Sequence, residues 1–299
     1  MHVFGKESKV ICLVAVHQRY EVSIETIKRL NNQTHPIEVV VVGGREEERL
    51  IAGSVKCRFI RHSNRWLGRK WQSALDYARE RSPDAVMICG SDSWLTLNWV
   101  ERMLPNLNKC DVAGKNIFYT CNAVFNEPLE IIKRTYKDSR NKNMPAGSGR
   151  LISASILNKI NWQMFPNKKN KGLDTLCRKK IIDAGGVYAV FNDDDDVNLL
   201  GIKSHWDVIT SYDRLKNAKS LRDMSFTEDA EAWIERNYPG GVEIIEGLRD
   251  VSYKRATMRE EFLKKRRKNM EDKKRQRAIK LKRDMAKRLR AKNKVRNRR

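Results

Sequence analysis

The sequence predicts an α/β domain with a mixed, mostly parallel sheet flanked by helices, followed by a basic helical extension. Uninterrupted apolar runs over 10–16, 39–42 and 85–89, the second of them preceded by Glu38, are typical of strands buried on both faces of a parallel sheet. The segments between them carry apolar side chains at helical spacing, as strand–helix–strand units require. The charge is uneven, because residues 254–299 hold 23 Lys and Arg against 5 Asp and Glu in a chain of net charge +24. A globular body and a cationic extension are therefore joined.

The first strand, over 10–16, is followed by a predicted helix over 20–32, which Asn31 and Asn32 end. The run 38–42 is the second strand, and residues 57–60 form a short third one. The pair Gly43-Gly44 is too short for a dinucleotide fingerprint and indicates only a tight turn. These elements predict a nucleotide-binding type of α/β domain.

Gly68, Arg69 and Lys70 stand at the predicted start of the next helix, whose apolar face continues to Ala78. Free backbone N–H groups and cationic side chains meet at such a helix start and can bind an anion. The alternative is a solvated basic turn.

The fourth apolar run, 85–89, ends abruptly in Gly-Ser-Asp-Ser at residues 90–93. Open α/β sheets bind their ligands at the carboxyl ends of the strands, so Asp92 is the first candidate for chemistry. The alternative is that Asp92 caps a predicted helix over 97–104.

Composition excludes several classes of protein. No apolar run approaches the ~20 residues of a membrane span, and the first residues do not resemble a signal peptide. The six cysteines are spread singly without a Cys-x-x-Cys pair, so we expect reduced core residues and not zinc ligands or disulfides. We therefore expect a cytoplasmic protein.

The second half predicts strands over 111–114 and 115–119, a Gly-rich segment over 145–153, and a helix over 175–184 that Asp174 opens. Further helices are predicted over 229–237 and 243–248. The four carboxylates at 193–196 lack the spacing of a calcium loop and are expected to face water.

Two segments carry a resemblance to a known family. Residues 67–71 read Leu-Gly-Arg-Lys-Trp and residues 90–93 read Gly-Ser-Asp-Ser. Together with the order of strands and helices, they resemble the GT-A glycosyltransferases of family 2, and are most similar to viral and phage members with Leu-Gly-x-Lys-Trp and Gly-Ser-Asp-Asp. The resemblance covers about residues 8–215. It implies a GT-A fold and transfer of a sugar from a nucleotide-sugar donor.

The resemblance also implies which residues bind the donor and a metal. The predicted donor site consists of His17, Arg19, Gly68, Lys70, Ser91 and Asp92. In similar enzymes the acidic motif holds Mn²⁺ or Mg²⁺ against the diphosphate, which implies that Asp92 is a metal ligand. His205 is the second predicted metal ligand, with a structural histidine as the alternative. Ser93 stands where the family has a second carboxylate.

For the acceptor, the resemblance implies a site along the Gly-rich segment. Gly147, Ser148 and Gly149 are its predicted members, and we add Trp94 to them. An ordinary flexible loop is the alternative for this segment. Asp174 resembles the general base that removes the proton of the acceptor hydroxyl in inverting members. Alternatively, Asp174 only caps its helix.

The predicted organisation is a glycosyltransferase domain over 1–215, a helical part over 216–253 that packs on it, and a basic tail over 254–299. We expect the tail to bind nucleic acid through its cationic side chains, foremost Lys264, Lys265, Arg266, Arg267 and Lys268. Aromatic residues are absent after Phe262, so base stacking is not expected. An anionic membrane surface and simple solubility are the alternatives.

These observations predict a metal-dependent glycosyltransferase that uses a UDP-sugar and modifies a hydroxymethylated pyrimidine in viral or phage DNA. A surface glycan or protein is the alternative acceptor. A non-catalytic nucleic-acid-binding protein is the second alternative, since Ser93 departs from the family pattern. Nucleotidyltransferases of the same fold carry a Gly-rich basic signature after the first strand, which His17-Gln18-Arg19 does not supply.

Overall fold

The structure is a computed structural model. It describes residues 3–135, 144–193, 195–203 and 229–251, together with Lys254, Met270 and Glu271. The chain divides into two units, Met1–Ser252 and Tyr253–Arg299, and the elements below belong to the first. The predicted metal ligand His205 and the predicted tail residues 264–268 lie outside the described residues.

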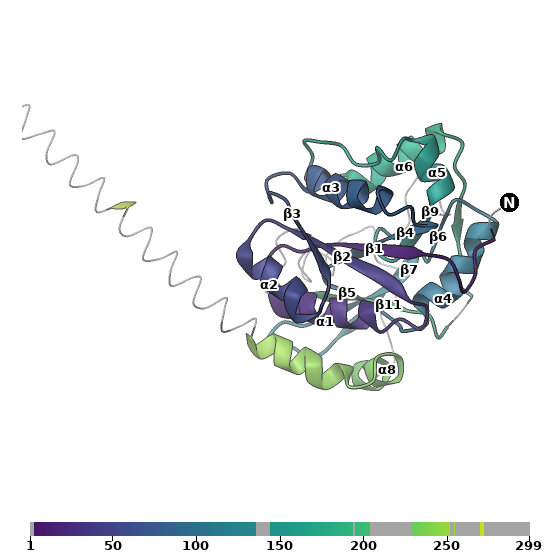
Figure 1. Ribbon diagram of the computed structural model, residues 1–299. Helices are drawn as coiled ribbons and strands as arrows, with labels where there is room; N and C mark the ends of the chain where they lie inside the picture. The colour runs from purple at the N-terminus through teal and green to yellow at the C-terminus, as the bar shows by residue number, and fades with distance from the viewer. Residues whose placement is uncertain are drawn as a thin grey trace, which may run out of the picture. The chain divides into compact units, whose positions relative to one another are not determined.

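A seven-stranded sheet forms the centre of the first unit (Figure 1). Its spatial order is β10-β6-β9-β4-β1-β2-β3, and β9 alone in this order runs antiparallel to its neighbours. The predicted mixed, mostly parallel sheet is therefore confirmed. The strands are β1 (Val10–Ala15), β2 (Ile37–Gly43), β3 (Arg58–Arg61), β4 (Ala85–Gly90), β6 (Val112–Gly114), β9 (Arg150–Ser153) and β10 (Tyr188–Val190).

Helices cover both faces of this sheet, which explains why its central strands are continuously apolar. In β1, Val10, Cys12 and Val14 face one core, whereas Ile11 and Leu13 face the other. The first core is closed by α1 (Tyr20–Asn31), α2 (Glu46–Ser54), α4 (Trp99–Met103) and the 3₁₀ helix η1 (Leu104–Asn108). The second is closed by α3 (Leu67–Arg79), α5 (Ala154–Lys159) and α6 (Leu173–Asp183).

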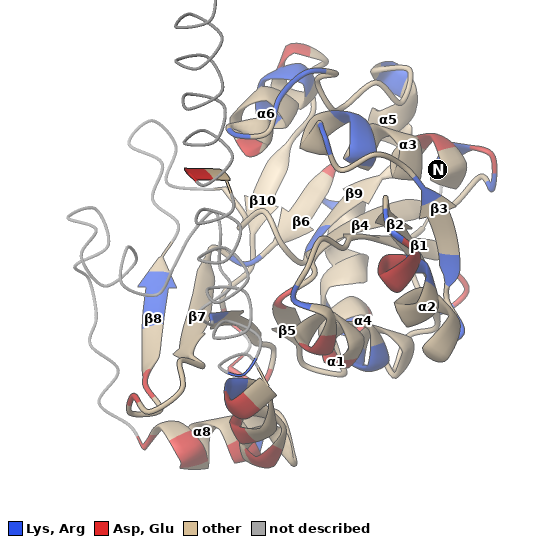
Figure 2. Cartoon of the chain, turned by 90° about the vertical axis from the view of Figure 1, so that its left-hand side faces the viewer, with Lys and Arg blue, Asp and Glu red and all other residues tan. Residues whose placement is uncertain are grey.

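A second, four-stranded sheet lies beside the first (Figure 2). Its order is β5-β11-β7-β8, formed by β5 (Ser93–Leu95), β11 (Leu199–Lys203), β7 (Ile117–Asn122) and β8 (Ile131–Thr135). Helix α8 (Ala230–Asn237) and the helical residues 241–251 cover this sheet through a third apolar core. Because β5 follows β4 after a two-residue turn, both sheets meet at the segment that contains Asp92.

Trp94 belongs to that third core, which corrects its predicted place in the acceptor site. Its side chain is fully buried. The ring of Tyr238 packs against it with centroids 6.0 Å apart, and the Arg29 guanidinium lies 4.2 Å from the indole centroid. Trp94 therefore holds the covering helices on β5 and has no surface left for a ligand.

All six cysteines lie in the described residues and none forms a disulfide. Five of them are buried and Cys57 is partly buried. Among the described helices, none is both long enough and apolar enough to cross a bilayer.

Candidate functional site

Asp92 lies in the turn between β4 and β5, at the carboxyl edge of the central sheet. Its Oδ2 atom accepts a hydrogen bond from Nη1 of Arg19 at 2.7 Å and another from Nζ of Lys203. Arg19 follows β1 and Lys203 ends β11, so three strand ends meet at one carboxylate. Helix α4 has Asn98 as its N-cap, which excludes the alternative that Asp92 caps a helix.

The charge state of Asp92 follows from these neighbours. Burial raises the pKa of its carboxyl, but the positive charges of Arg19 and Lys203 and their hydrogen bonds outweigh burial and hold the pKa well below its usual range. The carboxylate is therefore ionised at every physiological pH. It keeps two like-charged side chains next to each other.

The loop after β1 holds unusual backbone. Gln18 and Arg19 both adopt left-handed conformations, with φ of 59° and 51°. Such conformations cost energy in residues other than glycine and cluster at functional sites. The Oε1 atom of Gln18 is buried and accepts no hydrogen bond from the described residues. This loop, predicted to hold the nucleoside, is therefore both strained and incompletely paired.

His17 of the same loop contacts a buried glutamate that the sequence did not indicate. Its Nδ1 atom lies 3.4 Å from Oε1 of Glu48, in the first turn of α2. Glu48 also accepts hydrogen bonds from the backbone N–H groups of Gly44 and Arg45 and from the Asn64 amide. Burial raises its pKa, but the hydrogen bonds and the charge of Lys70 prevail and lower the pKa to about 2.

Gly43 makes room for this glutamate, and Gly44 donates its N–H to it. A Cβ atom at residue 43 would lie 2.6 Å from Oε2 of Glu48. The two glycines therefore serve the attachment of α2 to the end of β2, and the sequence signal for a tight turn has a packing reason.

We expect Glu48→Gln to lower the free energy of unfolding at pH 7 by about 1–3 kcal/mol, because the buried donors around residue 48 lose their charged acceptor. The folded-state pKa is lower than the ordinary 4.5, so this stabilisation is fully present above that value and is lost as the pH falls toward about 2. Urea unfolding at pH 7 and pH 2.5 measures both states. An equal difference between variant and wild type at both pH values would contradict the assignment.

Lys70 points into the protein, which corrects its predicted role as a phosphate ligand. It is 1% exposed, and its ammonium group donates to the carbonyl of Val16 and to Oδ1 of Asn64. Burial lowers its pKa to about 8 despite the nearby charge of Glu48. Lys70 therefore links α3 to the ends of β1 and β3.

The predicted anion site at Gly68 is corrected as well. Helix α3 starts at Leu67, and the N–H groups of Leu67 and Gly68 already donate to Oδ1 of Asn170 and to the carbonyl of Lys169. A Cβ atom at residue 68 would lie 2.0 Å from the carbonyl oxygen of Pro166. The glycine thus permits the close approach of the segment 166–170, which takes up the first two N–H groups of the helix in place of a phosphate.

Gly68→Ala is therefore expected to destabilise the protein by about 1–3 kcal/mol, as overpacking at a tight contact does. Chemical denaturation monitored by tryptophan fluorescence measures this loss. Gly53→Ala is the matched control, because Gly53 lies in α2 with open space around its Cβ position and alanine is the better helix former. Equal stability of the two variants would contradict the role of Gly68.

The Gly-rich segment connects the two candidate carboxylates. Ser148 Oγ accepts a hydrogen bond from the Gly90 N–H at 2.8 Å, next to the Asp92 turn. At the adjacent Gly147, a Cβ atom would lie 2.9 Å from Oδ1 of Asp174. Tertiary structure therefore brings Asp92, Ser148, Gly147 and Asp174 into one neighbourhood.

Two other predicted residues turn out to serve the core. Gly149 has a φ of 78°, its carbonyl accepts a hydrogen bond from the Trp99 indole, and its Cβ position lies 2.6 Å from that ring. It is therefore removed from the acceptor site. Ser91 is buried, and its carbonyl accepts a hydrogen bond from Thr26.

Asp174 lies in the first turn of α6, but it is not the N-cap, which is Gly172 in a left-handed conformation. Its carboxylate is exposed over 55% of the side chain and accepts a hydrogen bond from Nη2 of the buried Arg150 at 2.7 Å. Asp174 and Arg150 line a small pocket together with Met144, Pro145, Gly147, Thr175 and Arg178. An accessible carboxylate held in place by an arginine has the placement that a general base needs.

The described residues alone do not fit a divalent cation at Asp92. No three His, Cys, Asp or Glu side chains converge anywhere in the described part of the chain. Asp92 Oδ2 already contacts two cationic groups, and Ser93 supplies a hydroxyl directed at Gly90 in place of a carboxylate.

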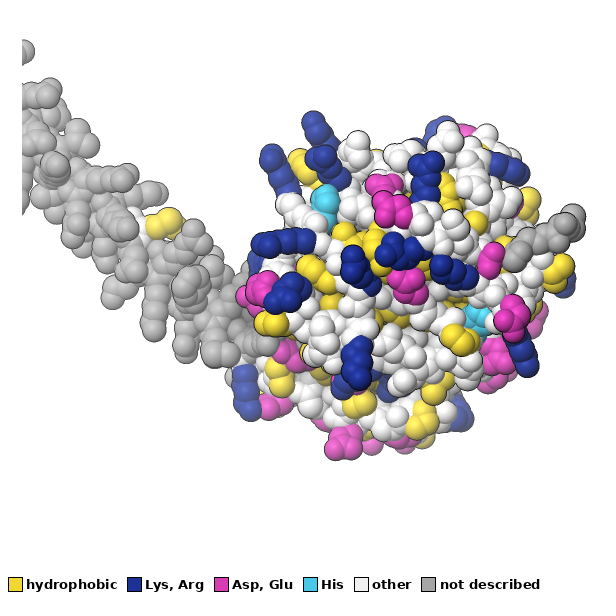
Figure 3. All heavy atoms as spheres, viewed as in Figure 1, with side chains coloured by type: hydrophobic (Ala, Val, Ile, Leu, Met, Phe, Trp, Pro, Cys, Tyr) yellow, Lys and Arg dark blue, Asp and Glu magenta, His cyan; other side chains and the backbone are white. Residues whose placement is uncertain are grey.

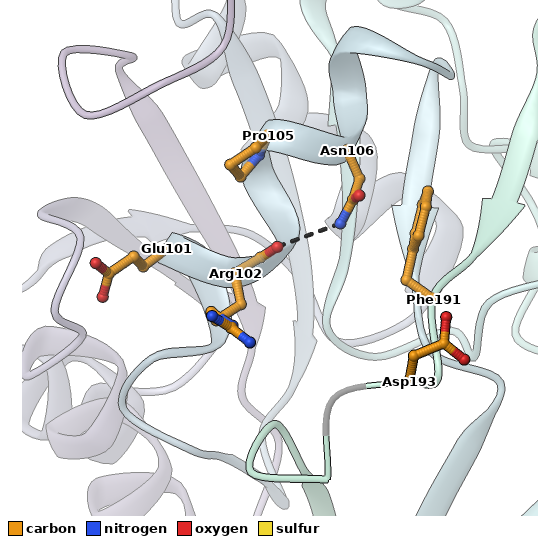
Figure 4. A pocket seen from close by; sticks show the side chains of 6 residues that line it. All are labelled: Glu101, Arg102, Pro105, Asn106, Phe191 and Asp193. Atoms are coloured by element: carbon orange, nitrogen blue, oxygen red, sulfur yellow. Dashed lines mark hydrogen bonds between the residues drawn. The ribbon is translucent and has the colours of Figure 1, made fainter.

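A separate, shallow hollow lies by α4 and η1 (Figure 4). Asn106 Nδ2 donates to the Arg102 carbonyl across one wall, and Glu101 accepts a hydrogen bond from Thr34. None of the predicted site residues lines this hollow, whose walls are formed by Glu101, Arg102, Pro105, Asn106, Phe191 and Asp193.

Sequence reasoning missed Lys203, Arg150 and Glu48. Lys203 ends a short strand in a lysine-rich chain, and Arg150 precedes an apolar run, so neither has a local signal. Glu48 had one weak signal, because an acidic residue two positions beyond the start of a helix is typical of a capping arrangement.

Comparison with known proteins identifies the family of the chain. Residues 11–160 match the sequence profile of glycosyl transferase family 2. No curated protein matches the chain.

Among solved structures, the chain is similar to S. aureus TarS 1-349, with 15% identity and a TM-score of 0.47, over 65% of this chain and 60% of that one. The same fragment in complex with UDP gives 15% identity and 0.48 over the same shares, and S. aureus TarS gives 14% and 0.44 over 66% and 35%. The chain thus spans less than two thirds of these proteins. With a sheet of the expected architecture and a profile match over half of its length, the chain belongs to glycosyl transferase family 2 and has its GT-A fold.

Proposed function

We propose that the protein is a glycosyltransferase that moves a sugar from a nucleoside diphosphate, with uridine as the expected nucleoside, to a hydroxyl acceptor. One observation carries the proposal. Two adjacent residues of the Gly-rich segment contact the surroundings of the two candidate carboxylates, Asp92 and Asp174. Ser148 bonds to the end of β4 beside Asp92, and Gly147 touches Asp174. Donor and base positions are thereby fixed relative to each other.

The reaction assigned to this arrangement is a single displacement. The acceptor oxygen attacks the anomeric carbon while its proton passes to the carboxylate of Asp174. The bond between the anomeric carbon and the diphosphate oxygen breaks, and the nucleoside diphosphate leaves with the electron pair. Positive charge beside Asp92 stabilises this leaving group.

For the acceptor, we propose a polyanion, and specifically a hydroxymethylated pyrimidine in DNA of a virus or phage, modified in the cytoplasm of the host. Beyond the charge of residues 254–299, the described body carries a basic surface beside α6. We name it the α3 basic surface, and it comprises the exposed residues Arg65, Arg69, Lys168, Lys169 and Lys171. Asn170 links the two segments of this surface: its Oδ1 accepts a hydrogen bond from the Leu67 N–H, and its Nδ2 donates one to the Arg65 carbonyl.

Figure 3 shows one face of the body, on which Lys and Arg side chains are numerous and Asp and Glu side chains lie among them. Asp174 follows Lys171 by three residues, so a duplex on the α3 basic surface would lie next to the proposed base. Phosphate contacts of this kind position a nucleic acid without reading its sequence. A base to be modified is then reached in a groove or by flipping it out.

The test is transfer from radiolabelled UDP-sugars to hydroxymethylated DNA, unmodified DNA and a mixture of surface glycans. Label appearing only in hydroxymethylated DNA supports the proposal. Label in the glycans would show that the acceptor is a glycan or a protein and not DNA. UDP binding without any transfer would favour a non-catalytic binding protein, for which the substitution of a carboxylate by Ser93 is the specific observation.

Reversing the charge of the α3 basic surface should weaken DNA binding. We test the triple variant Lys168→Glu/Lys169→Glu/Lys171→Glu. The logarithm of the DNA association constant falls linearly with the logarithm of the salt concentration, and we expect this fall to become less steep by about 3, since each phosphate contact contributes close to one to the slope. Fluorescence anisotropy with a labelled duplex measures it. Lys28→Glu, an exposed lysine of α1 in the other helical layer, is the control. Equal slopes for the triple variant and the wild type would exclude this surface.

A further inference from the structure

We propose that Arg19 and Lys203 neutralise the donor diphosphate directly, in the place where the family uses a divalent cation, and that Asp92 positions them instead of binding metal. The inference rests on the proposed function and concerns the same site. It follows from the contacts of one carboxylate.

The two cationic side chains are slightly more exposed than the carboxylate that holds them. The side chains of Arg19 and Lys203 are 20% and 16% exposed, whereas that of Asp92 is 11% exposed. Both cationic groups are therefore partly accessible to a ligand from solvent.

The Oδ2 oxygen of Asp92 is occupied by two cationic partners. Oδ2 accepts from Arg19 and Lys203, and Oδ1 lies 3.0 Å from the Cβ position of Gly90. A Mg²⁺ or Mn²⁺ ion bound to Oδ2 at about 2 Å would lie within a few ångströms of both cationic groups. Coulomb repulsion at such distances opposes binding strongly in a half-buried site. The cation would have to expel Lys203, Arg19 or both.

The second carboxylate that would attract a metal is replaced as well. Ser93 is 6% exposed, and its hydroxyl lies near the Cβ position of Gly90, 2.8 Å away. The predicted metal position therefore has one carboxylate fewer than the family pattern, and Lys203 lies against the carboxylate that is left. Both changes favour an anionic ligand over a cationic one.

The two side chains suit a diphosphate. The planar guanidinium of Arg19 can donate two parallel hydrogen bonds to one phosphate, and the ammonium of Lys203 acts as a compact charge on the other. Without Asp92 the two cations would repel each other. Asp92 is therefore a positioning residue that preorganises them before the donor arrives.

The experiment measures binding of UDP, ADP, GDP and CDP and of the matching monophosphates by calorimetry, each in EDTA and in Mn²⁺. For the diphosphate that binds, we expect affinities in EDTA and Mn²⁺ that agree within a factor of about three. Lys203→Met should weaken diphosphate binding about tenfold or more, the loss of one charged hydrogen bond, and leave monophosphate binding nearly unchanged. Lys203→Arg should retain most of the affinity, and Lys179→Met on α6 is the control.

Unfolding curves establish that Lys203→Met is folded, and the wild-type comparison in EDTA stands without any variant. Diphosphate binding that requires Mn²⁺ would overturn the inference and leave the glycosyltransferase proposal intact. Unchanged binding by folded Lys203→Met would also overturn it. No binding of any nucleoside diphosphate in either buffer would overturn the proposed function itself.

Discussion

Asp92→Ala is expected to abolish measurable donor binding and to lower the free energy of unfolding by about 3–5 kcal/mol, the cost of leaving buried charges without their partner. Arg19 and Lys203 lose the carboxylate that holds them together, so they separate and no longer present adjacent charges to a diphosphate. Calorimetry with UDP and urea unfolding measure the two effects.

The stability effect has a defined pH dependence. The folded-state pKa of Asp92 lies below its ordinary value of 3.8, so the stabilisation is fully present above that value and is lost as the pH falls below it. The control is Asp76→Ala on the exposed face of α3, where the carboxylate accepts a hydrogen bond from the Gln72 amide. Folded Asp92→Ala that binds UDP as the wild type does would remove Asp92 from the donor site.

Asp174→Asn is expected to reduce the rate of transfer about 10²–10⁴-fold, the usual contribution of a general base, while the affinity for the donor stays the same. The amide keeps the shape of the side chain but cannot take up the acceptor proton. The amide oxygen can still accept the hydrogen bond of the buried Arg150, so the variant should fold, with some loss of stability because the buried guanidinium loses its charged partner. Single-turnover transfer and donor calorimetry on the same preparation separate the two quantities.

Asp183→Asn, at the other end of α6, removes the same charge from an exposed pair with Lys179 and should leave the rate unchanged. A variant at residue 174 with wild-type rate would show that another group accepts the proton. A loss of donor affinity in the same variant would instead assign Asp174 to donor binding.

The fold followed from local sequence where strands are buried on both faces. The runs that became β1, β2 and β4 are continuous apolar segments, and no other structure buries them as well. Three short strands, β9, β10 and β11, escaped prediction, whereas the similarly short β3 and β6 were predicted. Helix α2 escaped as well, since three glutamates and an arginine dominate its first turns and leave a weak apolar face.

By itself, the sequence determined the α/β class, the strand-end position of Asp92 and Arg19, and the helix start that carries Asp174. Only tertiary structure decided which polar residues face a ligand. Lys70, Gly68 and Trp94 look like site residues in the sequence and are structural, whereas Lys203 reaches Asp92 across 111 positions. The physical reason is that a charged residue or a glycine stands in the same kind of sequence pattern in both cases. It can pair with a buried partner, or it can contact a substrate. The difference lies in long-range contacts that chain order does not encode locally.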